Sequence, residues 1–195
     1  KAFEFESFES APAGPFRSLE TSLGVWSTTD GDAAVDDRHA RTDKQCLWLK
    51  GGKRSSVTLQ LKQPLTEPTE LSFWAERWTR REPFSFRVEL YAGDQWQPVL
   101  RGDEPIRVGR SFRSRVRVTI DKPLVTQIRF SVASPNETGV LIDDVRLSPK
   151  TPQRIMGVDA VPMTLPALVG LESNPILKLN IHVAGNQNPI SVTQL

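Results

Sequence analysis

Apolar and polar residues alternate along most of this chain, in short runs separated by Gly, Pro, Asn and Asp. The run Ser56–Leu61 shows the pattern clearly, with Val57, Leu59 and Leu61 at every second position. Successive side chains of a β-strand point to opposite faces, so a period of two predicts strands with one buried face. Helical periodicity is nearly absent. The alternation therefore predicts an all-β chain.

The alternating runs recur about every 10 to 15 residues, as in β-sandwiches and jelly rolls. Prolines such as Pro64, Pro83 and Pro123 fall between the runs, where a missing N–H does least harm. We therefore expect a jelly-roll β-sandwich over residues 1–149. The side chains predicted to face its interior are Leu71, Phe73, Phe84, Phe86, Val88, Leu90, Val116, Val118, Ile128 and Phe130.

The sequence changes character after the predicted sandwich. Ser148–Gln153 has the Ser, Pro and Lys composition of a linker, and we assign residues 150–173 to that linker. Residues 176–183 alternate again, and residues 189–195 begin a further strand. A lone hairpin is marginal in water, so residues 174–195 are expected to begin a second, incomplete β-domain. Pairing of this partial hairpin with a second chain is the alternative.

Composition excludes several classes of function. A single cysteine, Cys46, forms no intrachain disulfide and no thiolate zinc site, and it is expected to be a small buried apolar residue. The net charge of +2 and the scattered aromatic residues argue against nucleic acid as a partner. The chain has no run of 18 apolar residues, so no membrane span is predicted. It begins with Lys1 and shows no signal peptide, which suggests a processed or partial chain.

No catalytic machinery is apparent. The nucleophile elbow Gly-x-Ser-x-Gly, the dinucleotide-binding Gly-x-Gly-x-x-Gly and the P-loop are all absent. The one tyrosine, Tyr91, has no motif around it that indicates a nucleophile. We therefore predict no catalytic residue in this chain.

Three segments together resemble the galactose-binding-like jelly-roll modules found among the carbohydrate-binding domains of secreted glycoside hydrolases. They are the Phe8-Glu9 strand followed by Gly24-Val25-Trp26, the stretch Asp37–Leu49, and the closing strand Val140–Leu147. Asp43 stands where these modules usually have glycine. The resemblance covers residues 3–148 and implies a non-catalytic, carbohydrate-binding function. It also implies a secreted or periplasmic location.

The tail resembles a different group of proteins. Asn174–Val183 and Gly185–Ile190 are similar to the opening of the β-domain that precedes the propeller in some bacterial sialidase-like proteins. This resemblance implies that the chain belongs to a larger glycoside hydrolase of the Asp-box type. The alternative is that residues 1–149 form a structural or protein-interacting sandwich that positions a catalytic domain.

The resemblance to carbohydrate-binding modules also implies a structural calcium ion that ties the first strand to the last. Carboxylates stand in suitable places, and the expected ligands are Glu9, Asp36 or Asp37, and Asp144. Asp143 and Asp144 are neighbours on one strand, so one of them should point inward, where a carboxylate needs a partner. A solvated acidic loop with one hydrogen-bonded aspartate is the alternative.

The outward-facing positions of the predicted strands carry aromatic and charged side chains. Sugar rings stack on aromatic planes, while arginine binds hydroxyl and carboxylate groups. A face of this kind suits an oligosaccharide, including an acidic one, and the predicted binding residues are Trp74, Trp78, Arg87, Tyr91 and Arg117. The alternative is a solvated sheet with cross-strand ion pairs and tryptophans packed under loops. Trp26 and Trp48 are expected to belong to the core.

Overall fold

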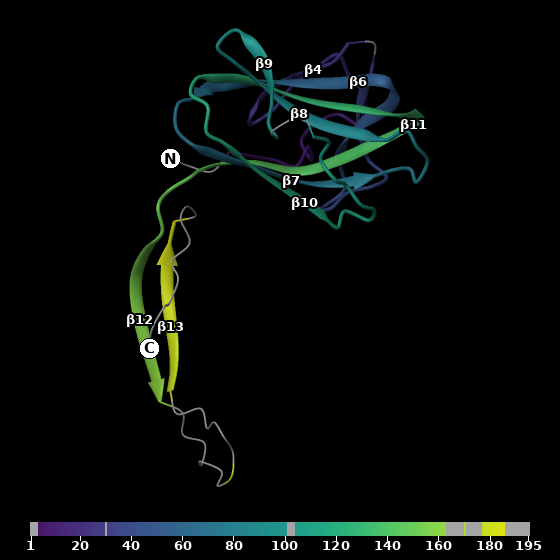
Figure 1. The fold of residues 1–195 in the computed structure, drawn as a ribbon. Coiled ribbons are helices and arrows are strands. Elements are labelled where there is room, and N and C mark those ends of the chain that lie inside the picture. Colours follow the sequence, from purple (N-terminus) through teal and green to yellow (C-terminus); the bar gives the residue numbers. More distant parts are fainter. Residues whose placement is uncertain (1–3, 30, 101–103, 163–169, 171–176, 186–195) are drawn as a thin grey trace. The chain divides into compact units, whose positions relative to one another are not determined.

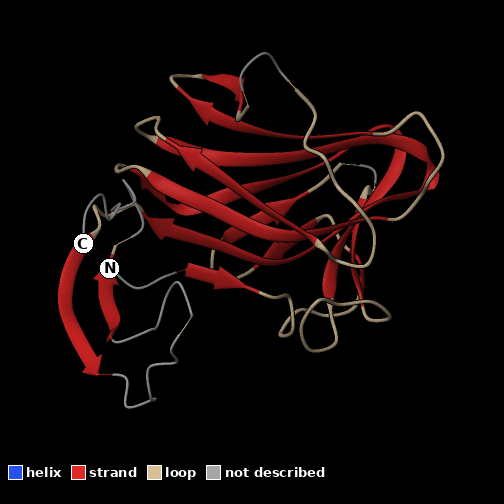
Figure 2. Cartoon of the chain, turned by 60° about the horizontal axis from the view of Figure 1, so that its bottom comes forward, coloured by secondary structure: helices blue, strands red, loops and turns tan. Residues whose placement is uncertain are grey.

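The computed structural model describes residues 4–29, 31–100, 104–162, 170 and 177–185. These residues form strands, turns and loops, and no helix occurs among them (Figure 2). Consequently, no helix in this part of the chain is long and apolar enough to cross a membrane. The chain divides into two compact units, Lys1–Pro149 and Lys150–Leu195.

The first unit is an open β-sandwich, as the alternation predicts (Figure 1). Its strands are β1 (Glu4–Glu6), β2 (Gly14–Pro15), β3 (Ser18–Glu20), β4 (Gly24–Ser27), β5 (Ala33–Asp36), β6 (Cys46–Leu65), β7 (Thr69–Arg77), β8 (Ser85–Ala92), β9 (Gln95–Pro98), β10 (Ser114–Ile120) and β11 (Val125–Pro149). Every pairing between them is antiparallel.

Two long strands, β6 and β11, take part in both layers of the sandwich. The first part of β6 pairs with β5, and its second part pairs with β4. The first part of β11 pairs with β8, and its last part pairs with β7. The two strands pair with each other from Val125 to Ile142 of β11, across a bend with register shifts between Val132 and Gly139 and a further shift after Val125. The sheets are therefore continuous at this bend.

The first layer has the order β10–β7–β11–β6–β5–β2, with β1 beside the end of β11. The second layer has the order β9–β8–β11–β6–β4–β3. Each layer buries one face, and the two buried faces form a single core. The outer faces remain for solvent or ligands, and the site is found there.

Aromatic rings fill the centre of this core. Phe130 stacks on Trp26 with a centroid distance of 5.6 Å and meets Phe73 edge-on at 5.4 Å. The ten predicted interior positions include nine buried side chains, which confirms the predicted strand phase. The tenth, Phe84, is half-buried, and the Arg77 guanidinium lies 4.0 Å from its ring centre. Trp26 and Cys46 are buried as predicted.

The second unit contains one antiparallel ribbon, formed by β12 (Arg154–Pro162) and β13 (Leu177–Ala184). The predicted linker over 150–173 is therefore wrong for residues 154–162. The predicted hairpin partner, residues 189–195, lies outside the described residues. The pairing of this strand shifts register between Ile155 and Gly157, and such an irregularity interrupts the alternation of apolar and polar side chains. Sequence periodicity therefore did not reveal the strand.

The ribbon has one apolar face and one polar face. Val158 lies opposite Ile181, and Ala160 lies opposite Leu179. On the other face Asp159 lies opposite Asn180, and its carboxylate is 2.7 Å from Nε2 of His182. His182 therefore lies on the polar face of the ribbon.

Candidate functional site

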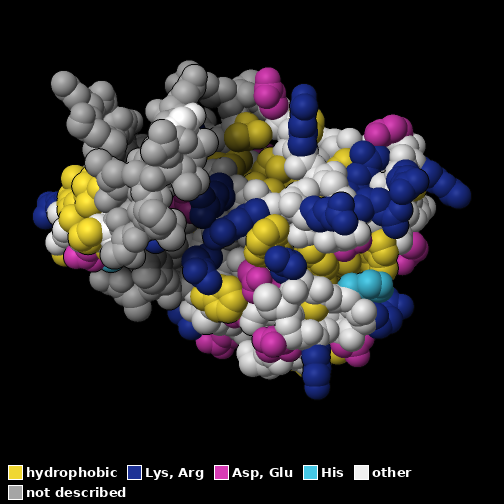
Figure 3. Space-filling view, turned by 90° about the horizontal axis from the view of Figure 1, so that it is seen from below, with side chains coloured by type: hydrophobic (Ala, Val, Ile, Leu, Met, Phe, Trp, Pro, Cys, Tyr) yellow, Lys and Arg dark blue, Asp and Glu magenta, His cyan; other side chains and the backbone are white. Residues whose placement is uncertain are grey.

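The outer face of the first layer carries three tryptophans, Trp48, Trp74 and Trp78, and is called the tryptophan face here. Across the strands, Trp74 lies between Arg115 and Asp143, and Leu141 lies between Glu76 and Trp48. A small apolar cluster of Cys46, Phe112 and Leu141 is buried there, and the three tryptophans pack against it half-buried. Burial raises the pKa of the Cys46 thiol, so this cysteine is a packing residue. Figure 3 views the molecule from below and shows Lys and Arg side chains interspersed with hydrophobic ones.

Trp48 was predicted to belong to the central core, and this prediction is wrong. Trp48 alternates with the core residues Leu47 and Leu49, so it points to the outer face. Its ring meets that of Trp78 edge-on at 4.8 Å. Its indole N–H donates to the carbonyl of Thr138 at 2.9 Å, and the backbone N–H of Trp78 donates to the carbonyl of Gly139 at 2.9 Å. The bend of β11 therefore positions both tryptophans.

The loop that follows β5 lies beside this face and is held by Asp36. One Asp36 oxygen accepts the backbone N–H groups of Arg38 and His39, and it lies 2.8 Å from Nδ1 of His39. The other oxygen accepts two N–H groups of the Arg38 guanidinium. Burial disfavours the charged carboxylate, but hydrogen bonds from His39 and Arg38 outweigh this effect and lower the pKa of Asp36. His39, fixed in this way, meets the Trp78 ring at 5.0 Å.

The rest of the loop is held by other carboxylates. Asp143, fully buried, accepts the backbone N–H groups of Arg41 at 2.7 Å and Thr42 at 3.2 Å. Burial raises the pKa of Asp143 to about 6, although these N–H groups favour the charged form. Further along the loop, Glu9 accepts the backbone N–H groups of Lys44 and Gln45. Carboxylates from β5, β11 and the segment after β1 thus fix the loop backbone.

Two hollows of about 340 Å³ each lie on or beside the tryptophan face and share Arg38. The first, called the Glu76 hollow, is lined by Arg38, His39, Ala40, Arg41, Glu76, Ser111 and Phe112. The second, called the Trp48 hollow, is lined by Ala13, Gly14, Pro15, Ala34, Val35, Asp36, Asp37, Arg38, Trp48 and Lys50. Together they offer aromatic surface, three carboxylates and several cations along one side of the sheet.

Ser111 and Phe112 border the Glu76 hollow with unusual backbone angles. Their φ values are +60° and +48°, which L-residues seldom adopt and which are rare for a bulky ring. Phe112 is buried against Cys46 and Leu141, and this packing offsets part of the conformational cost. Such strain is concentrated at functional sites in proteins, and here it places one wall of the hollow.

The five predicted glycan-binding residues do not share one face. Trp74 lies on β7, Trp78 directly follows β7, and Arg117 lies on β10. All three therefore belong to the first layer. Arg87 and Tyr91 come from β8 and belong to the second layer. The single predicted face is therefore wrong, because alternation separates inside from outside and leaves open which sheet a strand joins.

On the outer face of the second layer, the aromatic side chains are engaged with neighbours. Tyr91 lies 5.3 Å from Trp96, and the Arg129 guanidinium lies 4.0 Å above the Trp96 ring. Arg129 also donates two hydrogen bonds of 2.8 Å to Glu89. This is the cross-strand ion pairing that was the alternative to a glycan face.

The predicted calcium ligands are spread over several interactions. Both oxygens of Asp36 already accept N–H groups, which does not fit a metal ligand. Asp144 accepts the hydroxyl of Thr42 at 2.7 Å, Glu9 binds the loop backbone, and Asp37 is exposed. Within the described ranges, no three His, Cys, Asp or Glu side chains are grouped to hold a metal ion. A calcium ion remains a prediction.

The structure adds residues to the site that sequence reasoning did not single out. Arg38, His39 and Arg41 lie beside the tryptophans because Asp36 and Asp143, from different strands, hold their backbone. Phe112 reaches the site from a loop without alternation. The only signal available in the sequence was the placement of Asp37–Leu49 in the resemblance to carbohydrate-binding modules.

The first unit is a jelly-roll β-sandwich, and the chain is similar to several solved structures. The K1 cleaved adhesin domain of Lys-gingipain from Porphyromonas gingivalis W83 is 14% identical, with a TM-score of 0.51, over 77% of this chain and 100% of that one. The CBM22-1 xylan-binding domain of Paenibacillus barcinonensis Xyn10C is 16% identical, with a TM-score of 0.43, over 71% and 92%. TmCBM61, solved with β-1,4-galactotriose, is 12% identical, with a TM-score of 0.46, over 74% and 99%.

At these identities the likeness concerns the fold. No family model matches the chain, and a comparison with curated proteins finds no match.

Proposed function

We propose that residues 1–149 form a non-catalytic carbohydrate-binding unit whose ligand lies along the Glu76 and Trp48 hollows. The observation that supports this proposal most directly is the arrangement of the tryptophan face. Aromatic side chains lie next to three carboxylates, a histidine and three cations, on a sheet whose loops are held by buried carboxylates. Sugars need this combination, because their C–H faces pack on aromatic rings while their hydroxyls need donors and acceptors.

The adjoining hollows indicate an oligosaccharide as the ligand. The Glu76 hollow supplies a carboxylate acceptor and arginine donors, and the Trp48 hollow supplies an indole ring. Because Arg38 lines both, one ligand can contact both hollows without leaving the protein surface. The fixed loop lowers the entropy lost on binding.

A glycan-array screen with paired variants tests this proposal. Glu76→Gln removes the carboxylate with little change of shape, and Trp48→Ala removes the ring from the second hollow. We expect selective binding by the wild type and a loss of about tenfold or more in each variant. Trp96→Ala, on the other layer, is the matched control and should bind normally.

The double variant Trp74→Ala/Trp78→Ala asks whether the other tryptophans contribute, and circular dichroism must show that it folds. A wild-type protein that is folded and binds no glycan on the array would refute the proposal.

A structural spacer is the second candidate, and one observation favours it. Trp74 and Trp78 are partly covered within the chain, because the Arg41 guanidinium lies 4.3 Å above Trp74 and His39 contacts Trp78. A sandwich that only positions a neighbouring domain would bind no glycan, so the array result separates the two functions.

The wider setting of this unit is part of the proposal. The resemblance of residues 174–190 to a sialidase-associated β-domain supports a parent glycoside hydrolase of the Asp-box type, located outside the cytoplasm. Sequencing the gene beyond the codon for Leu195 tests this point. Asp-box repeats are expected there, and an unrelated domain would refute the proposed parent.

A further inference from the structure

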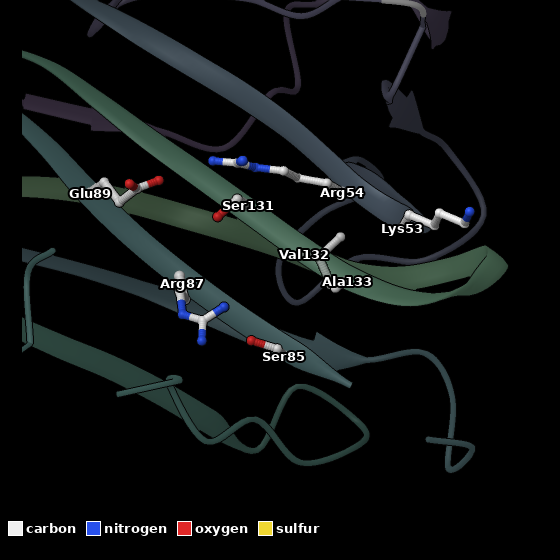
Figure 4. A pocket seen from close by; sticks show the side chains of 8 residues that line it. All are labelled: Lys53, Arg54, Ser85, Arg87, Glu89, Ser131, Val132 and Ala133. Carbon is white, nitrogen blue, oxygen red and sulfur yellow. The ribbon is translucent and has the colours of Figure 1, made fainter. Parts of the chain in front are cut away.

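A third hollow, of about 270 Å³, lies on the outer face of the second layer and is called the cationic hollow here. β6 supplies Lys53 and Arg54, β8 supplies Ser85, Arg87 and Glu89, and β11 supplies Ser131, Val132 and Ala133. Figure 4 shows Arg54 extending over β11 toward Ser131, while Arg87 and Ser85 come from β8. Among its described lining residues no aromatic ring occurs, in contrast to the Glu76 and Trp48 hollows.

The charges around the cationic hollow favour an anion. Its one carboxylate, Glu89, is matched by Arg129 through two hydrogen bonds of 2.8 Å, both side chains being about one-fifth exposed. Lys53 and Arg54 are exposed, so the net charge of the hollow is positive even without the charge of Arg87. Hydrogen bonds from such cations to oxyanions are roughly twice as strong as neutral ones.

A serine hydroxyl adds a second, independent observation. Oγ of Ser85 is buried and has no hydrogen-bond partner among the residues that the structure describes. Leaving a buried polar group without a partner is costly, so such a group is expected to find one in a ligand or in water. A hydroxyl donates readily to an oxyanion, and Ser131 lines the same hollow with another.

We propose that the cationic hollow binds the sulfate or carboxylate group of an acidic polysaccharide. The hollow has cations and hydroxyls for the charged group and no ring on which a sugar would stack. The inference rests on the proposed carbohydrate-binding function for its choice of ligand, and it assigns the acidic group to the second layer. The tryptophan face lies on the other layer, on the opposite side of the sandwich from the cationic hollow, and there it contacts the sugar rings of a glycan.

The test measures binding of dextran sulfate, with unsulfated dextran as the uncharged polymer, by isothermal titration at fixed salt. Lys53→Ala/Arg54→Ala should weaken dextran sulfate binding about tenfold or more. The control Lys62→Ala/Arg146→Ala removes the same charge from residues outside all three hollows and should change affinity much less. Ser85→Ala should also weaken binding while leaving net charge unchanged.

Two outcomes overturn the inference. Equal losses in the hollow and control variants would show diffuse attraction between the cationic protein and any polyanion. A single-stranded DNA oligonucleotide that binds as tightly as dextran sulfate, with the same loss in Lys53→Ala/Arg54→Ala, would show a site for polyanions rather than polysaccharides. Competition by inorganic sulfate, weak and lost in Ser85→Ala, would support the site.

This experiment separates the two proposals. Array ligands whose binding needs Glu76 and Trp48 should bind the Lys53→Ala/Arg54→Ala variant normally. This result would support both the tryptophan-face site and the separate anion site. A protein that binds dextran sulfate through the hollow and no array ligand would retain the anion site and refute the tryptophan-face function.

Discussion

Gly139 lies at the bend of β11 and should be among the positions least tolerant of a side chain. Its φ is +104°, and a Cβ added there would lie 2.2 Å from the Leu49 carbonyl oxygen and 2.8 Å from the Gly51 nitrogen. Both atoms belong to the backbone of β6, which is paired with β11 and cannot move alone. The change Gly139→Ala therefore combines backbone strain with a steric clash.

The magnitude follows from these two contributions. A residue in a sparsely populated region of φ and ψ costs about 1–3 kcal/mol, and forcing extra atoms into a packed site costs about 1–3 kcal/mol more. We expect Gly139→Ala to lower the free energy of unfolding by about 4 kcal/mol, a large share of the about 5–15 kcal/mol typical of a domain. Gly93→Ala is the control, because φ is +59° and a Cβ there would meet nothing within 4 Å. It should cost about 1 kcal/mol.

Urea unfolding followed by circular dichroism measures both values. Tryptophan fluorescence supplies a second readout, since the carbonyl of Gly139 accepts the backbone N–H of Trp78 and so positions this residue. Gly139→Ala should shift the emission spectrum of the folded protein, and Gly93→Ala should not. If the two variants were destabilised equally, within about 1 kcal/mol, the argument that the bend admits only glycine would be wrong.

Three further predictions concern the core, titration and calcium. Phe130→Ala should lower the unfolding free energy by about 4 kcal/mol, whereas Phe5→Ala, at a half-exposed ring, should cost less than about 1 kcal/mol. The pKa of Asp143 is about 6 in the folded protein and 3.8 for an ordinary solvated aspartate, so the folded state binds the extra proton. Stability should therefore fall by about 2 kcal/mol from pH 4 to pH 7 relative to Asp143→Leu, and a rise would show that the N–H donors outweigh burial. If calcium is a structural ligand, chelation should lower the melting temperature by several degrees, and an unchanged melting temperature would refute that prediction.

The sequence predicted the strands well because burial imposes a strict period of two. Phe73, Phe86 and Phe130 were placed in the interior from alternation alone, and each is buried. The prediction was wrong for Trp48, which is aromatic and follows an apolar residue but points outward. Residue type suggested burial there, while its phase between Leu47 and Leu49 gave the correct face.

The site was less predictable because it depends on contacts between distant segments. Asp143 holds the backbone of Arg41 and Thr42 across about a hundred residues of sequence, and no local pattern encodes that contact. Asp43 illustrates the opposite case. The sequence has aspartate where the modules that it resembles usually have glycine, and the structure gives it a φ of +51°, so the left-handed turn is kept without glycine.

The long strands β6 and β11 also determine how the sandwich comes apart. Since each belongs to both layers, and the two layers bury a single core between them, neither layer can open without exposing that core. Hydrogen exchange at Leu59 in one layer and at Leu49 in the other should then occur through a common opening reaction with one free energy. Most neighbours in the sheets are far apart in sequence, so the same design implies slow folding, limited by long-range strand pairing.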